Sequence, residues 1–242
     1  MNESIVALRE RFEAVAQEAQ TLSFLPRATE LQEASCQATG ELLEKLQGAK
    51  AAAVQRGDDD AANTLLAMEL ALQTVLEELR MWIDLKRDAA ESAWDHLVSA
   101  QGACEDAIRV RRQLQAKPPT AGLENVLKRL VWIERMVFPP QVFNSIGGTA
   151  RWRECSICGR SYDDCSHVKG RAYMGKLCHR ILHDVQPEEI SIVTHPANKR
   201  ARITHFSDQG KMRNKLTWRL EEAGAVQPLR KAGSGAPTPK AS

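Results

Sequence analysis

The chain has 242 residues, of which 43% are hydrophobic and 26% charged, which is enough apolar material for one large domain or two small ones. It contains no apolar run of the about 18–20 residues that a membrane-spanning helix needs. Acidic and basic residues interrupt the apolar pattern at the N-terminus, which argues against a signal or transit peptide. We therefore expect a cytoplasmic protein with no membrane partner and with reduced cysteines.

Charge is distributed unevenly along the chain. Residues 1–146 hold 16 Lys and Arg against 22 Asp and Glu, a net −6, whereas residues 147–242 hold 17 against 9, a net +8. This asymmetry indicates that the C-terminal part meets something acidic, such as nucleic acid. The alternative is an acidic half and a basic half that are both simply solvated.

The first predicted helix covers residues 3–22, where apolar residues recur at spacings of three and four. They are Ile5, Leu8, Phe12, Val15 and Ala19. Pro26 then breaks the chain. A second helix is predicted at residues 28–56, because Gly57 ends it and the aspartates at 58–60 favour the N-terminus of the next helix.

Residues 58–117 continue the helical pattern, in which only Gly102 disfavours a helix. Pro118 and Pro119 end this stretch, and a short helix with a strongly apolar stripe is predicted at residues 123–138. Residues 1–140 are thus predicted to form an antiparallel bundle or a long helical hairpin, which could also mediate homo-oligomerisation. Cys36 and Cys104 lie in helical pattern and are expected to pack as small hydrophobic residues.

Five potential metal ligands follow within 24 residues: Cys155, Cys158, Cys165, His167 and Cys178. The first two form a Cys-x-x-Cys pair followed by Gly159, a spacing that lets two thiolates converge on one metal ion. Disulfides do not fit a chain without a secretion signal, and a thioredoxin-like site needs a βαβ context. We therefore predict one Zn²⁺ ion, held by Cys155, Cys158, Cys178 and either Cys165 or His167. Because thiolates dominate, the site is expected to be closed and structural.

The rest of the chain is predicted to contain strands. Alternating apolar residues indicate two strands within 189–206, with a turn at residues 196–198. Residues 211–222 are predicted to form a short basic helix. The expected organisation is a helical bundle or hairpin at 1–140, a linker at 141–150, a zinc-binding β-rich domain at 151–222 and a disordered tail at 223–242. The predicted fold class is α+β, a helical bundle or long helical hairpin followed by a small zinc-stabilised β-rich domain.

Basic residues cluster in the last part of this domain and form a candidate nucleic-acid face, with Trp218 as a stacking platform. They are Lys199, Arg200, Arg202, Lys211, Arg213, Lys215 and Arg219. The alternative is that these charges solvate a small domain or pair with the acidic helical half. The partner is therefore either nucleic acid or another protein.

Two runs within residues 155–203 each carry a resemblance to other proteins. The run EISIVTHPAN resembles the closing strand of phage prohead maturation proteases, which Glu189, Ser191, Val193, Pro196, Ala197 and Asn198 match. The Cys-x-His-x-x-Gly-x-x-Tyr-x-Gly segment that begins at Cys165 is similar to zinc-bearing versions in uncharacterised prokaryotic and phage proteins.

The resemblance implies a histidine and a serine nucleophile on neighbouring strands. His167 could stand at the histidine position, but Ser166 adjoins it and Ser191 belongs to the closing strand. A serine without a base at hydrogen-bond distance is not activated, and a histidine that ligates zinc cannot serve as that base. A degenerate relative with a role in phage assembly, without protease activity, is the expectation from this resemblance.

A zinc-knuckle ββα-metal endonuclease of the HNH-like type is a further alternative. Residues 164–167 are similar to that arrangement, and His179, His183 and Asn198 could complete it, but no helix carrying the second His or Asn is evident. The leading interpretation is a non-catalytic zinc-binding recognition or assembly protein of a prokaryotic or phage system, in phage assembly or host defence.

Overall fold

The α+β prediction is confirmed by the computed structural model, which describes residues 5–24, 28–116 and 118–222. The chain divides into two compact units, one ending at Arg202 and one beginning at Ile203. The first unit contains the helices and a long two-stranded ribbon, and the second contains a small sheet. None of the helices in the described ranges combines the length and the apolar character that crossing a membrane requires. The tail predicted at 223–242 and the break at Pro26 lie outside the described residues.

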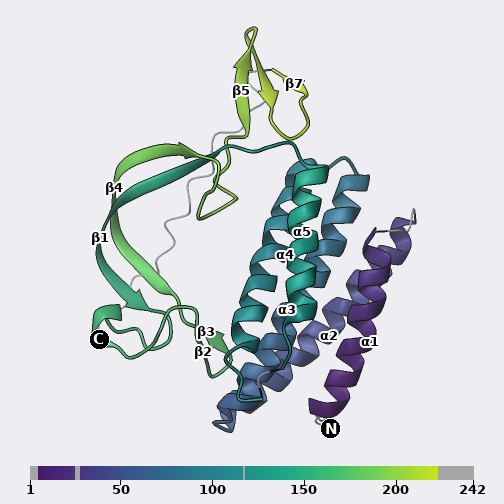
Figure 1. Cartoon of the computed structure of the whole chain (residues 1–242), viewed down its shortest axis with the longest axis vertical. Coiled ribbons are helices and arrows are strands. Elements are labelled where there is room, and N and C mark those ends of the chain that lie inside the picture. The colour runs from purple at the N-terminus through teal and green to yellow at the C-terminus, as the bar shows by residue number, and fades with distance from the viewer. Residues whose placement is uncertain (1–4, 25–27, 117, 223–242) are drawn as a thin grey trace, which may run out of the picture. The chain divides into compact units, whose positions relative to one another are not determined.

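Five helices form the described helical half (Figure 1). They are α1 (Ile5–Phe24), α2 (Thr29–Gln55), α3 (Asp59–Lys86), α4 (Ala90–Arg111) and α5 (Ala121–Val137). Helix α3 is central, because α1, α2 and α4 all pack against it, and α5 packs against α4. Leucines of α1, α2 and α3 close the core between these helices, among them Leu8, Leu42, Leu46, Leu65 and Leu72.

The boundary between α3 and α4 was not expected from the sequence. Asp88 takes a left-handed conformation with φ of 61°, and the Ala89 N–H donates to the Asp84 carbonyl at 2.9 Å. Aspartate adopts this conformation more readily than most residues, because its short polar side chain can bond locally. Gly102, the one residue predicted to disfavour helix, lies inside α4.

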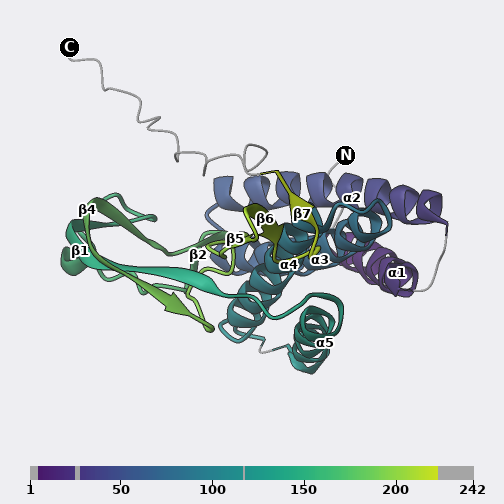
Figure 2. The same cartoon turned by 90° about the horizontal axis from the view of Figure 1, so that it is seen from above.

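A long antiparallel ribbon follows the helices (Figures 1 and 2). Strand β1 (Phe143–Cys155) pairs with β4 (Arg180–Val193), from Phe143 opposite Val193 to Cys155 opposite Arg180. The linker predicted at 141–150 therefore lies mostly in a strand. The Gly- and Ser-containing sequence of this segment is extended because it forms ladder hydrogen bonds with β4. A local sequence pattern cannot reveal a pairing with so distant a strand.

A small hairpin between β1 and β4 contacts the helices. It consists of β2 (Ala172–Tyr173) and β3 (Lys176–Leu177), preceded by a 3-10 turn, η1 (Tyr162–Asp164). At its tip the N–H groups of Met174 and Gly175 donate to Asp59 Oδ1 at 2.6 Å and to Asn63 Oδ1 at 2.9 Å. Gly175 has φ of 72°, and a Cβ atom there would lie 3.0 Å from the Lys50 side chain, so only glycine fits without strain.

The predicted boundary at residue 150 therefore separates parts that form one compact unit. The second unit holds β5 (His205–Asp208), β6 (Lys211–Asn214) and β7 (Leu220–Glu221) in the order β5-β6-β7. The helix predicted at 211–222 is thus replaced by two strands. The reason is a two-residue turn at Gln209 and Gly210, both with positive φ, which folds the chain back as a hairpin.

Candidate metal centre

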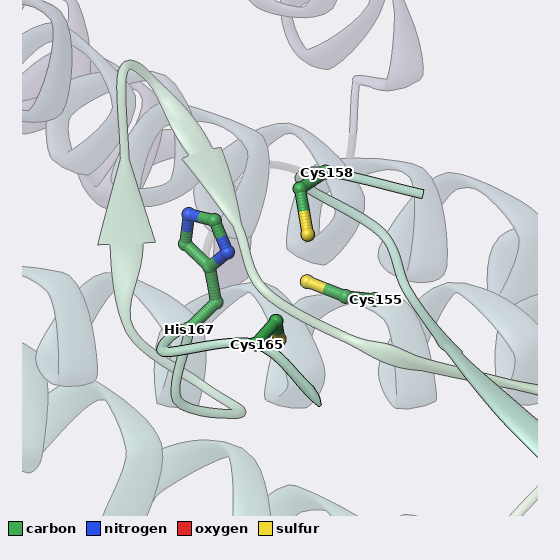
Figure 3. A group of neighbouring side chains, drawn as sticks. All are labelled: Cys155, Cys158, Cys165 and His167. Carbon is green, nitrogen blue, oxygen red and sulfur yellow. The ribbon is translucent and has the colours of Figure 1, made fainter. Parts of the chain in front are cut away.

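Four of the five predicted ligands converge at the end of β1. The sulfur atoms of Cys155, Cys158 and Cys165 and a ring nitrogen of His167 all lie within 4.8 Å of one another (Figure 3). Tetrahedral zinc with Zn–S bonds of about 2.3 Å holds its sulfur ligands about 3.8 Å apart. This group could therefore hold one metal ion after a small contraction.

A tight turn positions the first two cysteines. The Cys155 N–H donates to the Arg160 carbonyl at 2.9 Å, and the Gly159 N–H donates to the Cys155 carbonyl at 2.8 Å. Arg153 on β1 bonds both oxygens of Asp163 in η1 at 2.9 Å, which holds the turn before Cys165 against the strand. Hydrogen bonds therefore hold the ribbon end and the loop beside each other, with the cysteines between them.

His167 provides an independent observation that favours a metal. Its Nδ1 atom is buried and has no hydrogen-bond partner. An imidazole nitrogen left buried and unpaired costs free energy, whereas coordination to a metal ion would satisfy it. The ring is held edge-on by Tyr173, with 4.7 Å between centroids, and lies beside the cysteine sulfurs (Figure 3).

The surroundings of the thiols favour ionisation at one end of the group. Burial acts to raise the pKa of Cys155, but the backbone N–H groups of Cys158 and Ile157 and the neighbouring thiols outweigh it and lower this pKa to about 7. The backbone N–H of Arg160 lowers the pKa of Cys158, and burial raises the pKa of Cys165. A thiolate that forms near neutral pH is a ready first ligand.

Cys178 stands next to this group but outside it. Its sulfur lies 3.8 Å from the Cys155 sulfur, and burial, followed by the neighbouring Cys155 thiol, raises its pKa to about 11. The sequence favoured Cys178 with only one of Cys165 and His167, whereas the structure brings both of these into the group of four. Ligand spacing alone could not rank five candidates, because the ranking depends on how the loop folds.

Besides His167, the endonuclease and protease alternatives need residues that lie outside the group of four. His183 bonds Glu154 at 2.8 Å and stacks on Trp152 with 4.3 Å between ring centroids, both on the ribbon. Ser191 lies opposite Ser145 in the β1–β4 ladder. In the part of the chain that the structure describes, the group of four is the one cluster of three or more potential metal ligands.

Three of the predicted nucleic-acid residues lie against the acidic helices. Lys199 bonds Glu134 of α5 at 2.5 Å and Gln101 of α4 at 2.9 Å. Arg200 bonds Ser99 at 2.6 Å and lies 4.0 Å from Asp95, and the largely buried Arg202 pairs with Glu91. These cations therefore engage the acidic helical half, as the alternative interpretation of the charge pattern holds.

The remaining basic residues belong to the second unit, and the predicted helical face that would have aligned them does not exist. Lys211 pairs with Glu222 at 2.9 Å, and Arg213 with Asp208 at 2.6 Å. Lys215 lies over the Phe206 ring, and Arg219 immediately precedes β7.

Comparison of the chain with models of known protein families, with curated proteins and with solved structures found no match.

Proposed function

We propose that this chain is a non-catalytic zinc-binding assembly protein, in which one structural zinc ion fixes the base of the β1–β4 ribbon to the helices. The convergence of Cys155, Cys158, Cys165 and His167, with a buried histidine nitrogen that has no other partner, is the observation that supports it. Tetrahedral sites of three cysteines and one histidine are typical of structural zinc.

The place of the group in the fold supports a structural role. Cys155 ends β1, and the loop that carries the other ligands leads to the hairpin bonded to α3. Gln113, just after α4, adds two bonds to this loop, to the Gly170 carbonyl at 3.0 Å and from the Ala172 N–H at 2.9 Å. A metal ion here would cross-link the ribbon end to the segment that docks on the bundle.

The donor set favours stability over catalysis. Three thiolates donate charge to the ion and weaken it as a Lewis acid, and four protein ligands leave no position for a reacting water. The pairing of Lys199, Arg200 and Arg202 with helical acids favours a protein partner over nucleic acid. A prokaryotic or phage setting, in assembly or defence, belongs to this proposal through the resemblance of residues 155–203.

Elemental analysis of the purified chain tests the metal, and about one zinc per chain is expected. His167→Ala should weaken zinc binding on the order of 100-fold or more, measured by competition with a chromophoric chelator. His179→Ala is the matched control, since its backbone N–H, not its ring, bonds Ser156. Equal zinc affinities for the two variants would overturn the proposal. An NMR spectrum that shows a folded ribbon after complete removal of the metal would overturn it too.

The same assay assigns the fourth ligand. Cys165→Ser should lose more affinity than Cys178→Ser, because the Cys165 sulfur belongs to the group of four. The reverse order would identify Cys178 as the ligand and Cys165 as its neighbour.

A further inference from the structure

The β1–β4 ribbon has one face that is mostly apolar, with Asn144, Glu154 and His183 as its polar members. In an antiparallel pair, residues directly opposite each other share a face, so every second residue of β1 joins its β4 partner on this side. We call this side the apolar ribbon face. Its apolar members are Ile146, Ala150 and Trp152 from β1 and Ile181, Val185, Pro187, Ile190 and Ile192 from β4.

A single extra residue in β4 creates this face. Gly147 lies opposite Glu189 and Gly148 opposite Pro187, so Glu188 is an unpaired residue in the ladder. Without such a bulge, side chains alternate strictly, and Ile190 would lie on the other side from Val185. The bulge shifts the alternation by one and brings both ends of β4 into one apolar surface.

The opposite face of the ribbon is mainly polar, apart from Phe143, Val193 and Leu182. It carries side chains such as Ser145, Thr149, Arg153, Gln186 and Glu189. Leu182 is the exposed large apolar residue on that side. The ribbon is therefore amphipathic, although a two-stranded sheet has no second layer to cover an apolar side.

The apolar ribbon face is open in the described structure. Ile146, Ile190 and Ile192 are 65%, 69% and 70% exposed, and Trp152, Ile181 and Val185 are each exposed by more than two fifths. At about 150–200 Å² for a full large side chain, these fractions leave on the order of 600 Å² of apolar surface. That equals the largest patch on a typical monomer, and patches of this size mark interaction sites.

We propose that the apolar ribbon face binds the same face of a second copy of this chain, forming a two-fold dimer. This inference rests on the proposed function, because the metal would hold the base of the ribbon. Two such faces would stack as layers about 10 Å apart, as in a β-sandwich. Together they would bury about 1,200 Å² of large apolar side chains, which reaches the range of specific interfaces.

Charge argues for a second copy as the occupant. The charged or titratable residues among the described positions of this face are Glu154 and His183, whose Oε2 and Nε2 atoms lie 2.8 Å apart near one end of the ribbon. Over the rest of the ribbon, identical faces can therefore meet without like-charge repulsion, as a two-fold interface requires. A strongly charged partner would find little on this face to recognise. Trp152, stacked on His183, has the character of an interface anchor.

Sedimentation equilibrium of the full zinc-loaded chain from about 1 to 100 µM, the concentration range of weak to moderate self-association, tests this proposal. We expect a dimer for the wild type. A double lysine variant, Ile190→Lys with Ile192→Lys, should raise the dimer dissociation constant at least about 100-fold, because the lysines would be buried without partners. Leu182→Lys on the opposite face is the matched control and should leave the dimer intact.

The outcomes separate this inference from the zinc proposal. A monomeric wild type with one zinc per chain overturns the dimer alone, and a dimer that Leu182→Lys weakens as much as the double lysine variant also overturns it. A monomer that binds phosphatidylcholine vesicles through Ile190 and Ile192 would assign the face to lipid instead. A chain without zinc that still dimerises through these residues contradicts only the proposed function.

Discussion

At the scale of single residues, the cysteines show how surroundings decide chemistry. Cys104 in α4 is fully buried, its thiol donates to the Leu123 carbonyl, and burial raises its pKa to about 11. The pKa of Cys155, within hydrogen-bond reach of several N–H groups, is lowered to about 7 instead. A thiol that stays protonated packs as a small hydrophobic residue, whereas one that ionises near neutral pH is available as a metal ligand.

Glu77 on α3 offers a pH test of the helical bundle. Burial acts to raise its pKa, but a hydrogen bond and charge from His96, with Arg80, outweigh this and lower the pKa below the ordinary 4.5. A carboxyl group with a lowered pKa stabilises the fold above its unfolded-state pKa, and this contribution is lost as the pH falls through the folded-state value.

Glu77→Gln should therefore lower the free energy of unfolding at pH 7 by about 1–3 kcal/mol. The difference from wild type should shrink as the pH is lowered below about 4.5. Urea unfolding followed by helical circular dichroism at pH 7 and at low pH measures both values. A deficit that stayed constant between the two pH values would show that the charge of Glu77 is not the cause.

At the scale of elements, the sequence pattern predicted those helices whose limits depend on local interactions. The periodicity of α1, α2 and α5 located these helices to within a few residues. The break at Asp88 escaped because neither glycine nor proline marks it. The ribbon segment before residue 150 was not predicted as a strand because its partner strand is distant in the sequence. The strands from residue 211 onward were not predicted because the turn at Gly210 determines their pairing. The five ligands were visible as spacing, but their grouping depends on the folded loop.

Two glycines in different elements should respond oppositely to alanine. A Cβ atom on Gly148 would lie 2.3 Å from the Gln186 carbonyl oxygen across the ladder, whereas one on Gly102 in α4 meets nothing within 4 Å. Gly148→Ala should destabilise the chain by about 1–3 kcal/mol. Gly102→Ala should stabilise it by about 0.5–1 kcal/mol through helix propensity.

Thermal unfolding of the zinc-loaded variants compares the two changes, with zinc content checked for each. A lower melting temperature for Gly102→Ala, or an unchanged one for Gly148→Ala, would contradict the packing around these positions.

At the scale of the whole chain, the structure gives the charge asymmetry an internal role in the first unit. The acidic excess of residues 1–146 and the basic excess that follows were predicted to indicate an acidic partner. Lys199, Arg200 and Arg202 instead reach acids on α4 and α5. The Trp94 indole N–H also donates to the Lys199 carbonyl at 3.1 Å. The segment after β4 is thus attached to the helices by opposite charge and by packing.

A charge swap at Lys199 and Glu134 tests this attachment. Lys199→Glu places two carboxylates together and leaves Gln101 without its donor, so stability should fall, whereas Lys199→Glu combined with Glu134→Lys restores opposite charges. We expect a favourable coupling of about 1 kcal/mol at low salt, since the pair is partly buried, and a smaller value as salt rises. Urea unfolding of the wild type, both single variants and the double variant gives this coupling.

If Lys199 instead contacted nucleic acid, the Lys199→Glu variant would keep its stability and lose a salt-sensitive complex in a mobility-shift assay. Retained stability together with such a loss would return Lys199, Arg200 and Arg202 to a nucleic-acid face.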